Sequence, residues 1–353
     1  DGSDQQRITR SAKSENNAVW IEGGRRIAFI YPVDGKGQLW VMNADGSDRK
    51  AVTSVENGIS GFKFSPDEKK IVMISNVKYA RTAQDIYPDL PKATGRVVDD
   101  LMYKHWDEWV SEIPHPFIGD FDGSSVGNIE DIMADEPFEA PMKPFGGVES
   151  FAWSPDSKTL VYVSRKKTGL EYAVSTNSDL YAYNLDTKET RNLTEGMTGY
   201  DTMPAFSPDG NSLAWLSMEH DGYESDKNRL FVLDMQTSEK TDLTSDWDYT
   251  IEEFAWSPDG RSIFFLAYRD GVKPMLNIGL DRAISPVAQG ECDYESLGVL
   301  ADGSVITMAH SMLRPNEICK VAAGADKAVA LTDVNGDIFS QLTMPTVERR
   351  MVP

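Results

Sequence analysis

The segment Gly123-Ser124-Ser125-Val126-Gly127 comes closest to a catalytic motif in this chain. The pattern G-x-S-x-G places a nucleophilic serine on a sharp turn that follows a buried strand and precedes a helix. Here the segment follows Asp122 in a stretch where the surrounding pattern predicts a hairpin turn, with Asp122-Gly123 as turn residues. No alternation of strands and helices surrounds it. We therefore expect Ser125 to be non-catalytic, and the sequence alone offers no catalytic residue.

Histidines and acidic clusters do not supply a metal or cofactor site either. The chain has four histidines, and their spacing matches neither a metal pair nor a base beside a nucleophile. The segment Asp333-Val334-Asn335-Gly336-Asp337 resembles a calcium-binding loop, but the downstream bidentate glutamate is missing, which favours a simple turn. We expect no metal and no cofactor.

The two cysteines, Cys292 and Cys319, leave two interpretations open. They fall within one structural repeat, where a disulfide between strands would suit an oxidising compartment. Two buried free thiols are the other interpretation. A structural zinc site is not expected, because there is no Cys-x-x-Cys pair.

A short repeated phrase, aromatic-Ser-Pro-Asp, indicates the architecture that must position any functional residue. Its four copies are Phe64–Asp67, Trp153–Asp156, Phe206–Asp209 and Trp256–Asp259. A repeat of roughly 50 residues built from strands is typical of a β-propeller. Proline presets the turn, and its fourth position favours glycine because the backbone there is left-handed. Gly210 and Gly260 meet this preference, whereas Glu68 and Ser157 predict less relaxed turns.

Apolar runs around these turns predict four-stranded blades. Complete or nearly complete blades are expected at about 16–53, 58–135, 148–194, 200–244, 250–289 and 293–332, and the last two have degenerate repeats. Residues 1–9 repeat the pattern of Asp45–Thr53, which predicts the last turn and outer strand of a further blade. Residues 336–350 could complete that blade or begin another. We therefore predict an all-β, seven-bladed propeller over residues 1–347, with eight blades as the alternative and a linker beginning at 348–353.

Composition limits the partners. The chain has 353 residues, of which 40% are hydrophobic, enough for a large core. No apolar run approaches the ~18 residues of a membrane helix. The net charge of −21 argues against nucleic acid, whose phosphates would be repelled. This acidity could serve solubility alone, or it could attract cationic ligands.

The second full blade contains an insert between about residues 76 and 121. The interval from Ser65 to Ser154 is 89 residues, much longer than the other repeats. Four apolar residues in it recur at helical spacing: Met102, Trp106, Trp109 and Ile113. With Asp99-Asp100 before them and Pro114 after them, this spacing predicts a helix. Loops of this length in a compact fold are often functional.

The insert sequence Leu101–Trp109, together with Pro114–Phe117, Gly199–Pro204 and the Ser-Pro-Asp-Gly turns, resembles a known family. The chain is similar to the N-terminal propeller of the prolyl oligopeptidase family of serine peptidases, in particular its dipeptidyl-peptidase and acylaminoacyl-peptidase branches. The resemblance covers essentially the whole chain. It implies that an α/β-hydrolase domain of the same polypeptide carries the catalytic triad, and that Val347–Pro353 leads into it.

The resemblance also implies a role. The propeller would admit short peptides to the triad, exclude folded proteins and hold the substrate's free N-terminal amine on acidic side chains of the helical insert. The implied substrate-binding residues are Glu108 and Asp107, where the best-known relative carries paired glutamates. A solvated helix face is the alternative for both. Asp201 is a weaker candidate, since such residues also cap blades.

Several expectations follow for the protein as a whole. We expect a periplasmic or secreted protein, with a homodimer left open and with no activity from this chain by itself. The alternative function is that of a non-catalytic TolB-type propeller that binds protein partners.

Overall fold

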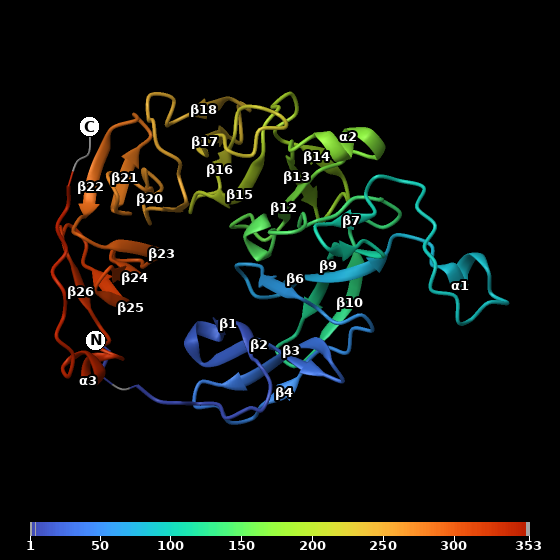
Figure 1. The fold of residues 1–353 in the computed structure, drawn as a ribbon, viewed down its shortest axis with the longest axis horizontal. Coiled ribbons are helices and arrows are strands. Elements are labelled where there is room, and N and C mark those ends of the chain that lie inside the picture. Colours follow the sequence, from blue (N-terminus) through green and yellow to red (C-terminus); the bar gives the residue numbers. More distant parts are fainter. Residues whose placement is uncertain (1, 4, 351–353) are drawn as a thin grey trace. The chain divides into compact units, whose positions relative to one another are not determined.

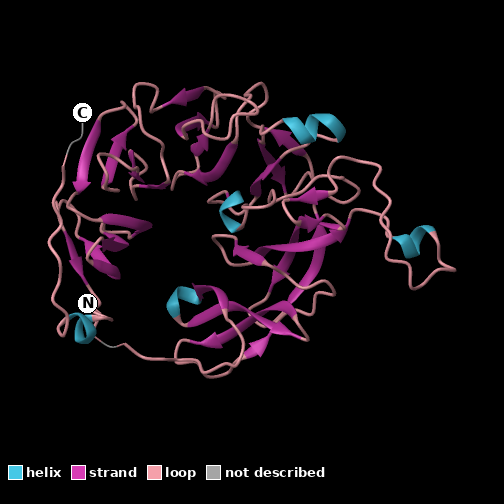
Figure 2. Cartoon of the chain, viewed as in Figure 1, coloured by secondary structure: helices cyan, strands magenta, loops and turns pink. Residues whose placement is uncertain are grey.

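The computed structural model describes residues 2–3 and 5–350. Within them, strands form six four-stranded sheets and one two-stranded hairpin (Figure 1). Helices are few and short: η1 (Glu22–Gly24), α1 (Ala83–Ile86), η2 (Val148–Ser150), α2 (Gly169–Val174) and α3 (Gly336–Phe339). Figure 2 shows this predominance of strands. The predicted all-β class and its four-stranded blades are confirmed.

Three sheets come from the first half of the chain. The first contains β1 (Asn16–Ile21), β2 (Arg26–Val33), β3 (Lys36–Asn43) and β4 (Lys50–Ala51). The second contains β5 (Gly61–Phe64), β6 (Lys70–Lys78), β9 (Glu112–Phe121) and β10 (Val126–Asp131), in the order β10-β9-β6-β5. The third contains β11 (Phe151–Trp153), β12 (Thr159–Ser164), β13 (Asp179–Asn184) and β14 (Thr190–Asn192).

The other three sheets follow in chain order. The fourth contains β15 (Asp201–Phe206), β16 (Ser212–Ser217), β17 (Arg229–Asp234) and β18 (Lys240–Asp242). The fifth contains β19 (Glu253–Trp256), β20 (Ser262–Leu266), β21 (Met275–Gly279) and β22 (Ile284–Ala288). The sixth contains β23 (Asp293–Val299), β24 (Val305–Ser311), β25 (Arg314–Val321) and β26 (Ala328–Ala330). The chain divides into two compact units, and the insert lies in the unit that includes Arg7–Phe206.

The repeated turns form as predicted. In each copy the serine hydroxyl donates a hydrogen bond of 2.6–2.7 Å to the aspartate two residues later. The fourth position is left-handed throughout, with φ of 73° at Gly210 and 67° at Gly260. Glu68 and Ser157 adopt the same conformation with φ of 56° and 61°, which costs a non-glycine residue free energy. The local sequence thus determines the turn even without glycine.

Apolar side chains on alternate strand positions build the core next to the insert. Phe151 and Tyr162 are fully buried, and they pack with Val72 and Ile74 of the preceding sheet. Successive side chains of a strand point to opposite faces, and this alternation delivers whole rows of residues to one cluster. The sheet that carries the insert is therefore firmly anchored.

The predicted seventh blade is wrong. Residues 2–3 and 5–9 contain no strand, and the segment expected to pair with them contains the helix α3. Gly2 instead lies against the end of the sixth sheet, where an added Cβ would stand 1.8 Å from the Leu331 carbonyl oxygen. Asp1 and Asp4 of the Asp-Gly phrase lie outside the described residues, and a strand also needs a neighbouring edge, which the phrase does not encode. Residues 351–353 of the expected linker lie outside the described residues.

The predicted helix in the insert is also wrong. Residues 104–109 form a hairpin of β7 (Lys104–His105) and β8 (Glu108–Trp109), with His105 opposite Glu108. Trp106 has a left-handed φ of 51°, which a helix interior does not permit. Met102 is buried but Trp106 is 73% exposed, and their spacing therefore does not mark one apolar face. The same spacing also fits a hairpin, in which Met102 and Ile113 are buried on either side of an exposed tip at Trp106.

Both cysteines are free thiols. Cys292 immediately precedes β23, whereas Cys319 lies in β25, and β24 runs between these strands. Two strand spacings amount to roughly 9–10 Å, while a disulfide needs Cα atoms within about 7 Å. The sheet order therefore favours the interpretation of two thiols. Burial raises the pKa of Cys319.

In the described part of the chain, no helix has the length and apolar character needed to cross a bilayer.

Candidate functional site

Residues 79–111 form the insert between β6 and β9, and a small apolar cluster anchors it. Met102 and Val110 are buried against Ile113 of β9 and Tyr172 of α2. The cluster thus joins the insert both to its own sheet and to the helix in the next one. In Figure 1 the part around α1 projects away from the sheet, whereas the hairpin β7–β8 lies close to it.

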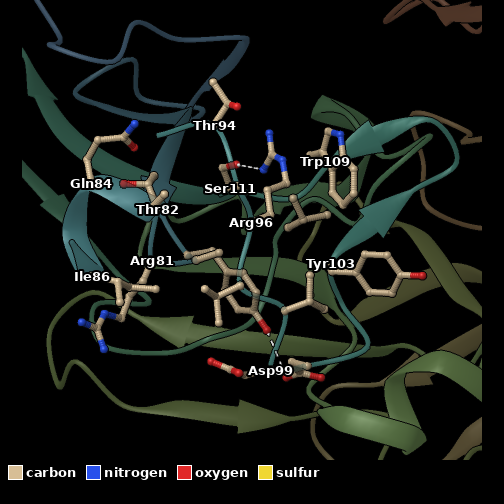
Figure 3. A pocket seen from close by; sticks show the side chains of 18 of the residues that line it. Arg81, Thr82, Gln84, Ile86, Thr94, Arg96, Asp99, Tyr103, Trp109 and Ser111 are labelled. Carbon is tan, nitrogen blue, oxygen red and sulfur yellow. Dashed lines mark hydrogen bonds between the residues drawn. The ribbon is translucent and has the colours of Figure 1, made fainter. Parts of the chain in front are cut away.

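A cavity of about 630 Å³ lies within the insert (Figure 3). Arg96 stacks over the Trp109 ring at 4.5 Å, and its Nη1 donates to Ser111 Oγ at 3.1 Å. The Tyr79 hydroxyl donates to Asp100 at 3.3 Å. Burial together with the Asp100 carboxylate raises the pKa of Tyr79 to about 12. Hydrogen-bonded and stacked polar groups therefore hold the irregular walls of this cavity.

Glu108 and Asp107, the carboxylates that the sequence singled out, lie next to each other on the hairpin. Asp107 is in its turn and Glu108 begins β8, and both side chains are exposed. Neither carboxylate makes a hydrogen bond or ion pair with any residue among 2–3 and 5–350. Both are accessible to a ligand from solvent, although they do not stand on a helix.

Asp201, the third candidate, lies in β15 and is fully buried. Its backbone N–H donates to Ser178 Oγ at 2.9 Å, and the same hydroxyl donates to the Asp201 carbonyl at 2.7 Å. This backbone arrangement resembles the capping role considered as its alternative. The structure does not place Asp201 in the exposed acidic pair of the hairpin.

Glu139 is a buried carboxylate that the sequence did not indicate. Its side chain is 1% exposed, in the loop between β10 and η2. The Tyr172 hydroxyl donates to Glu139 Oε1 at 3.0 Å, and His105 Nε2 lies 3.1 Å from Oε2. Three segments distant in sequence thus converge on one carboxylate.

The surroundings of Glu139 keep the carboxylate oriented. Ser164 Oγ donates to the Glu139 carbonyl at 2.9 Å and fixes the backbone. Burial and the Glu139 carboxylate both raise the pKa of Tyr172, which preserves the phenol as a donor. Arg165 lies over the Tyr172 ring at 5.0 Å. A buried carboxylate costs free energy unless cationic or donor groups surround it, and here Tyr172 and His105 are those groups.

Ser125 is not part of this site. The turn between β9 and β10 contains it, and Asp122 accepts hydrogen bonds from the Ser124 and Ser125 amides at 2.8 Å. Its hydroxyl donates to Asp122 at 3.1 Å, so its partner is a turn aspartate and not a histidine base. The hairpin turn expected from the sequence is confirmed.

The sheets define the class of the protein as a β-propeller of four-stranded blades. The chain belongs to the TolB beta propeller domain family, because the model of that family matches residues 145–341. Dipeptidyl-peptidase 5 of Porphyromonas gingivalis is 46% identical over 351 residues, which cover 99% of this chain and 51% of that protein. Dipeptidyl-peptidase 5 of Porphyromonas endodontalis is 43% identical over 352 residues, with the same coverage.

A solved structure also matches the fold. The acylaminoacyl peptidase of Pyrococcus horikoshii superposes with a TM-score of 0.66 at 17% identity, covering 93% of this chain and 46% of that one. Together with the two dipeptidyl-peptidase 5 matches, this likeness of fold confirms the resemblance to peptidase propellers found from the residues. The chain spans about half the length of the curated relatives it matches.

Proposed function

We propose that this chain is the substrate-gating propeller of a serine exopeptidase that removes dipeptides from short peptides. The observation that carries the proposal is the 46% identity to a dipeptidyl-peptidase 5 over 99% of this chain. The catalytic triad would reside in an α/β-hydrolase domain of the same polypeptide, as the family resemblance implies. The propeller would then admit extended peptides and exclude folded proteins.

The free amine of the substrate would bind to a carboxylate of this chain. Glu108 and Asp107 are exposed and unpaired in the described structure, which supports access. Glu139 is a second candidate, supported by its burial and by the two groups that orient it. A charged hydrogen bond is worth more in a dry site than in water. We therefore favour Glu139 as the main amine anchor, with the hairpin pair attracting the cation.

A TolB-type propeller that only binds proteins is not favoured. The insert and the buried Glu139 carboxylate that its His105 contacts have no evident use in such a protein, and the curated relatives named above are peptidases. We further propose a periplasmic or secreted location, where short peptides would be available as substrates.

The test compares this chain with the full-length polypeptide on peptides of increasing length, with dipeptide release measured by chromatography. We expect no turnover by the chain alone. The full-length polypeptide should cleave short free-amine peptides and leave a folded protein with an accessible N-terminus essentially intact. Ser125→Ala is the matched control and should change neither result. Turnover by the chain alone that disappears in Ser125→Ala would contradict the proposal, as would equal rates on peptides and folded proteins.

A further inference from the structure

Both oxygens of the Glu139 carboxylate already have partners. Oε1 accepts the Tyr172 hydroxyl at 3.0 Å, and Oε2 accepts from the His105 imidazole at 3.1 Å. The two donors also lie 3.3 Å from each other. With Glu139 only 1% exposed, a ligand cation can reach it only if one of these donors moves.

The two donors are not equally held. Tyr172 belongs to α2, packs in the cluster with Met102 and Ile113, and carries Arg165 over its ring. Displacing it would expose a buried aromatic side chain, which is costly.

His105 stands on a hairpin whose strands have only two residues each. Two contacts fasten its outer part to the loop between β10 and η2. One is the pair of His105 with Glu139, and the other is the edge-to-face stack of Trp106 on Phe145 with ring centroids 5.1 Å apart. Trp106 and Phe145 are 73% and 75% exposed, so their separation changes little buried area. His105 is therefore the donor that can leave at the smaller cost.

We propose that His105 is a displaceable latch over Glu139. A peptide ammonium takes the position of the imidazole at Oε2, while Tyr172 continues to donate to Oε1. The statement rests on the proposed function, in which Glu139 anchors the amine. An ammonium brings a full charge and three donors, whereas a blocked, uncharged N-terminus brings no charge and cannot repay the loss of the imidazole contact. The latch thus rejects blocked peptides by occupying their place.

A closed latch lowers the observed affinity for every ligand of the site. When the competent form is only a fraction of the population, the apparent Kd rises by the inverse of that fraction. Removing the imidazole should therefore tighten binding of a free-amine ligand. A residue with a purely structural role would have the opposite effect when removed, because the site would lose order.

The experiment measures binding to the full-length polypeptide by calorimetry, using glycyl-phenylalanine and its N-acetyl form as probes. His105→Ala should bind the free dipeptide roughly tenfold more tightly, as expected for a latch closed about nine-tenths of the time. His105→Gln restores a donor to Glu139 and should return the affinity toward that of the wild type. His220→Ala, which removes another histidine paired with a carboxylate, should leave it unchanged. Glu139→Gln should weaken binding of the free dipeptide roughly 10- to 150-fold.

The outcomes separate the two proposals. If Glu139→Gln weakens binding by tenfold or more but His105→Ala binds no more tightly than the wild type, the latch is refuted and the amine anchor stands. If Glu139→Gln binds the dipeptide as well as the wild type does, the anchor in the proposed function is refuted and the latch with it. Equal tightening of the N-acetyl dipeptide by His105→Ala would also refute the latch, because exclusion would then not depend on charge.

Discussion

Replacing Glu139 by glutamine should separate the recognition of a free amine from every other part of the reaction. Glutamine has nearly the same volume, and its amide oxygen can still accept from Tyr172, but the negative charge is gone. Because the side chain is 1% exposed, water cannot substitute for the lost charge. The full-length polypeptide should therefore lose turnover of free-amine peptides while it remains folded.

The burial of each carboxylate decides how far kcat/KM falls when its charge is removed. A hydrogen bond to a charged group contributes about 1.5–3 kcal/mol, and since each 1.4 kcal/mol is tenfold, kcat/KM should fall roughly 10- to 150-fold. Glu108 is exposed, and an exposed ion pair contributes about 0.2–1 kcal/mol. Glu108→Gln should accordingly lower kcat/KM only about 1.4- to 5-fold.

The assay compares kcat/KM on a chromogenic dipeptide substrate with a free amine and on its N-acetyl form. Both variants should affect the free-amine substrate only, and Glu171→Gln, an exposed glutamate of α2, is the matched control. Thermal unfolding checks that each variant is folded. A larger loss in Glu108→Gln than in Glu139→Gln would refute the reasoning from burial, and equal losses on both substrates would remove Glu139 from the amine site.

Two further predictions concern the structure around the site. Met102→Ala should destabilise the insert locally by about 2–5 kcal/mol, seen as faster amide exchange in residues 102–110 with unchanged exchange in the sheets. Leu101→Ala, at an exposed position, is the control. Equally fast exchange in both variants would refute the anchoring role of Met102. Although burial raises it, hydrogen bonds from the His220 side chain and from the His220 and Glu219 amides hold the pKa of Asp226 at about 2. The carboxylate therefore stabilises residues 219–226 above its unfolded pKa near 3.8, and this stability is lost as the pH falls toward 2. Amide exchange of residues 219–226 should become faster as the pH falls from about 4 to 2, and the Asp226→Asn variant should lack this change. A change of equal size in the wild type and the variant would show that Asp226 is not its source.

The repeated turns were predictable because their chemistry is local. Serine, proline and aspartate at adjacent positions close the turn by contacts within five residues, and the strands on either side alternate regardless of their neighbours. The six complete blades could thus be located in the sequence to within a few residues. The same reasoning predicted one blade too many, because the Asp-Gly phrase at the N-terminus predicts a turn but carries no information about an available sheet edge.

The spacing of apolar residues could not decide the secondary structure of the insert. Met102, Trp106, Trp109 and Ile113 recur at intervals of three and four, which fits one face of a helix. The same intervals fit a hairpin whose ends are buried and whose tip is exposed, as found here. Only the left-handed backbone at Trp106 and the docking of Met102 beside Tyr172 distinguish the two.

The sequence by itself determined the class of fold, the turns and the location of the insert, because each depends on residues adjacent in the chain. Tertiary structure alone decided which carboxylate is buried and what faces it. His105, Glu139 and Tyr172 are separated by more than thirty residues from one to the next, and no local pattern connects them. Their meeting depends on how a hairpin, a loop and a short helix pack together, and that packing is fixed by the apolar side chains beneath them.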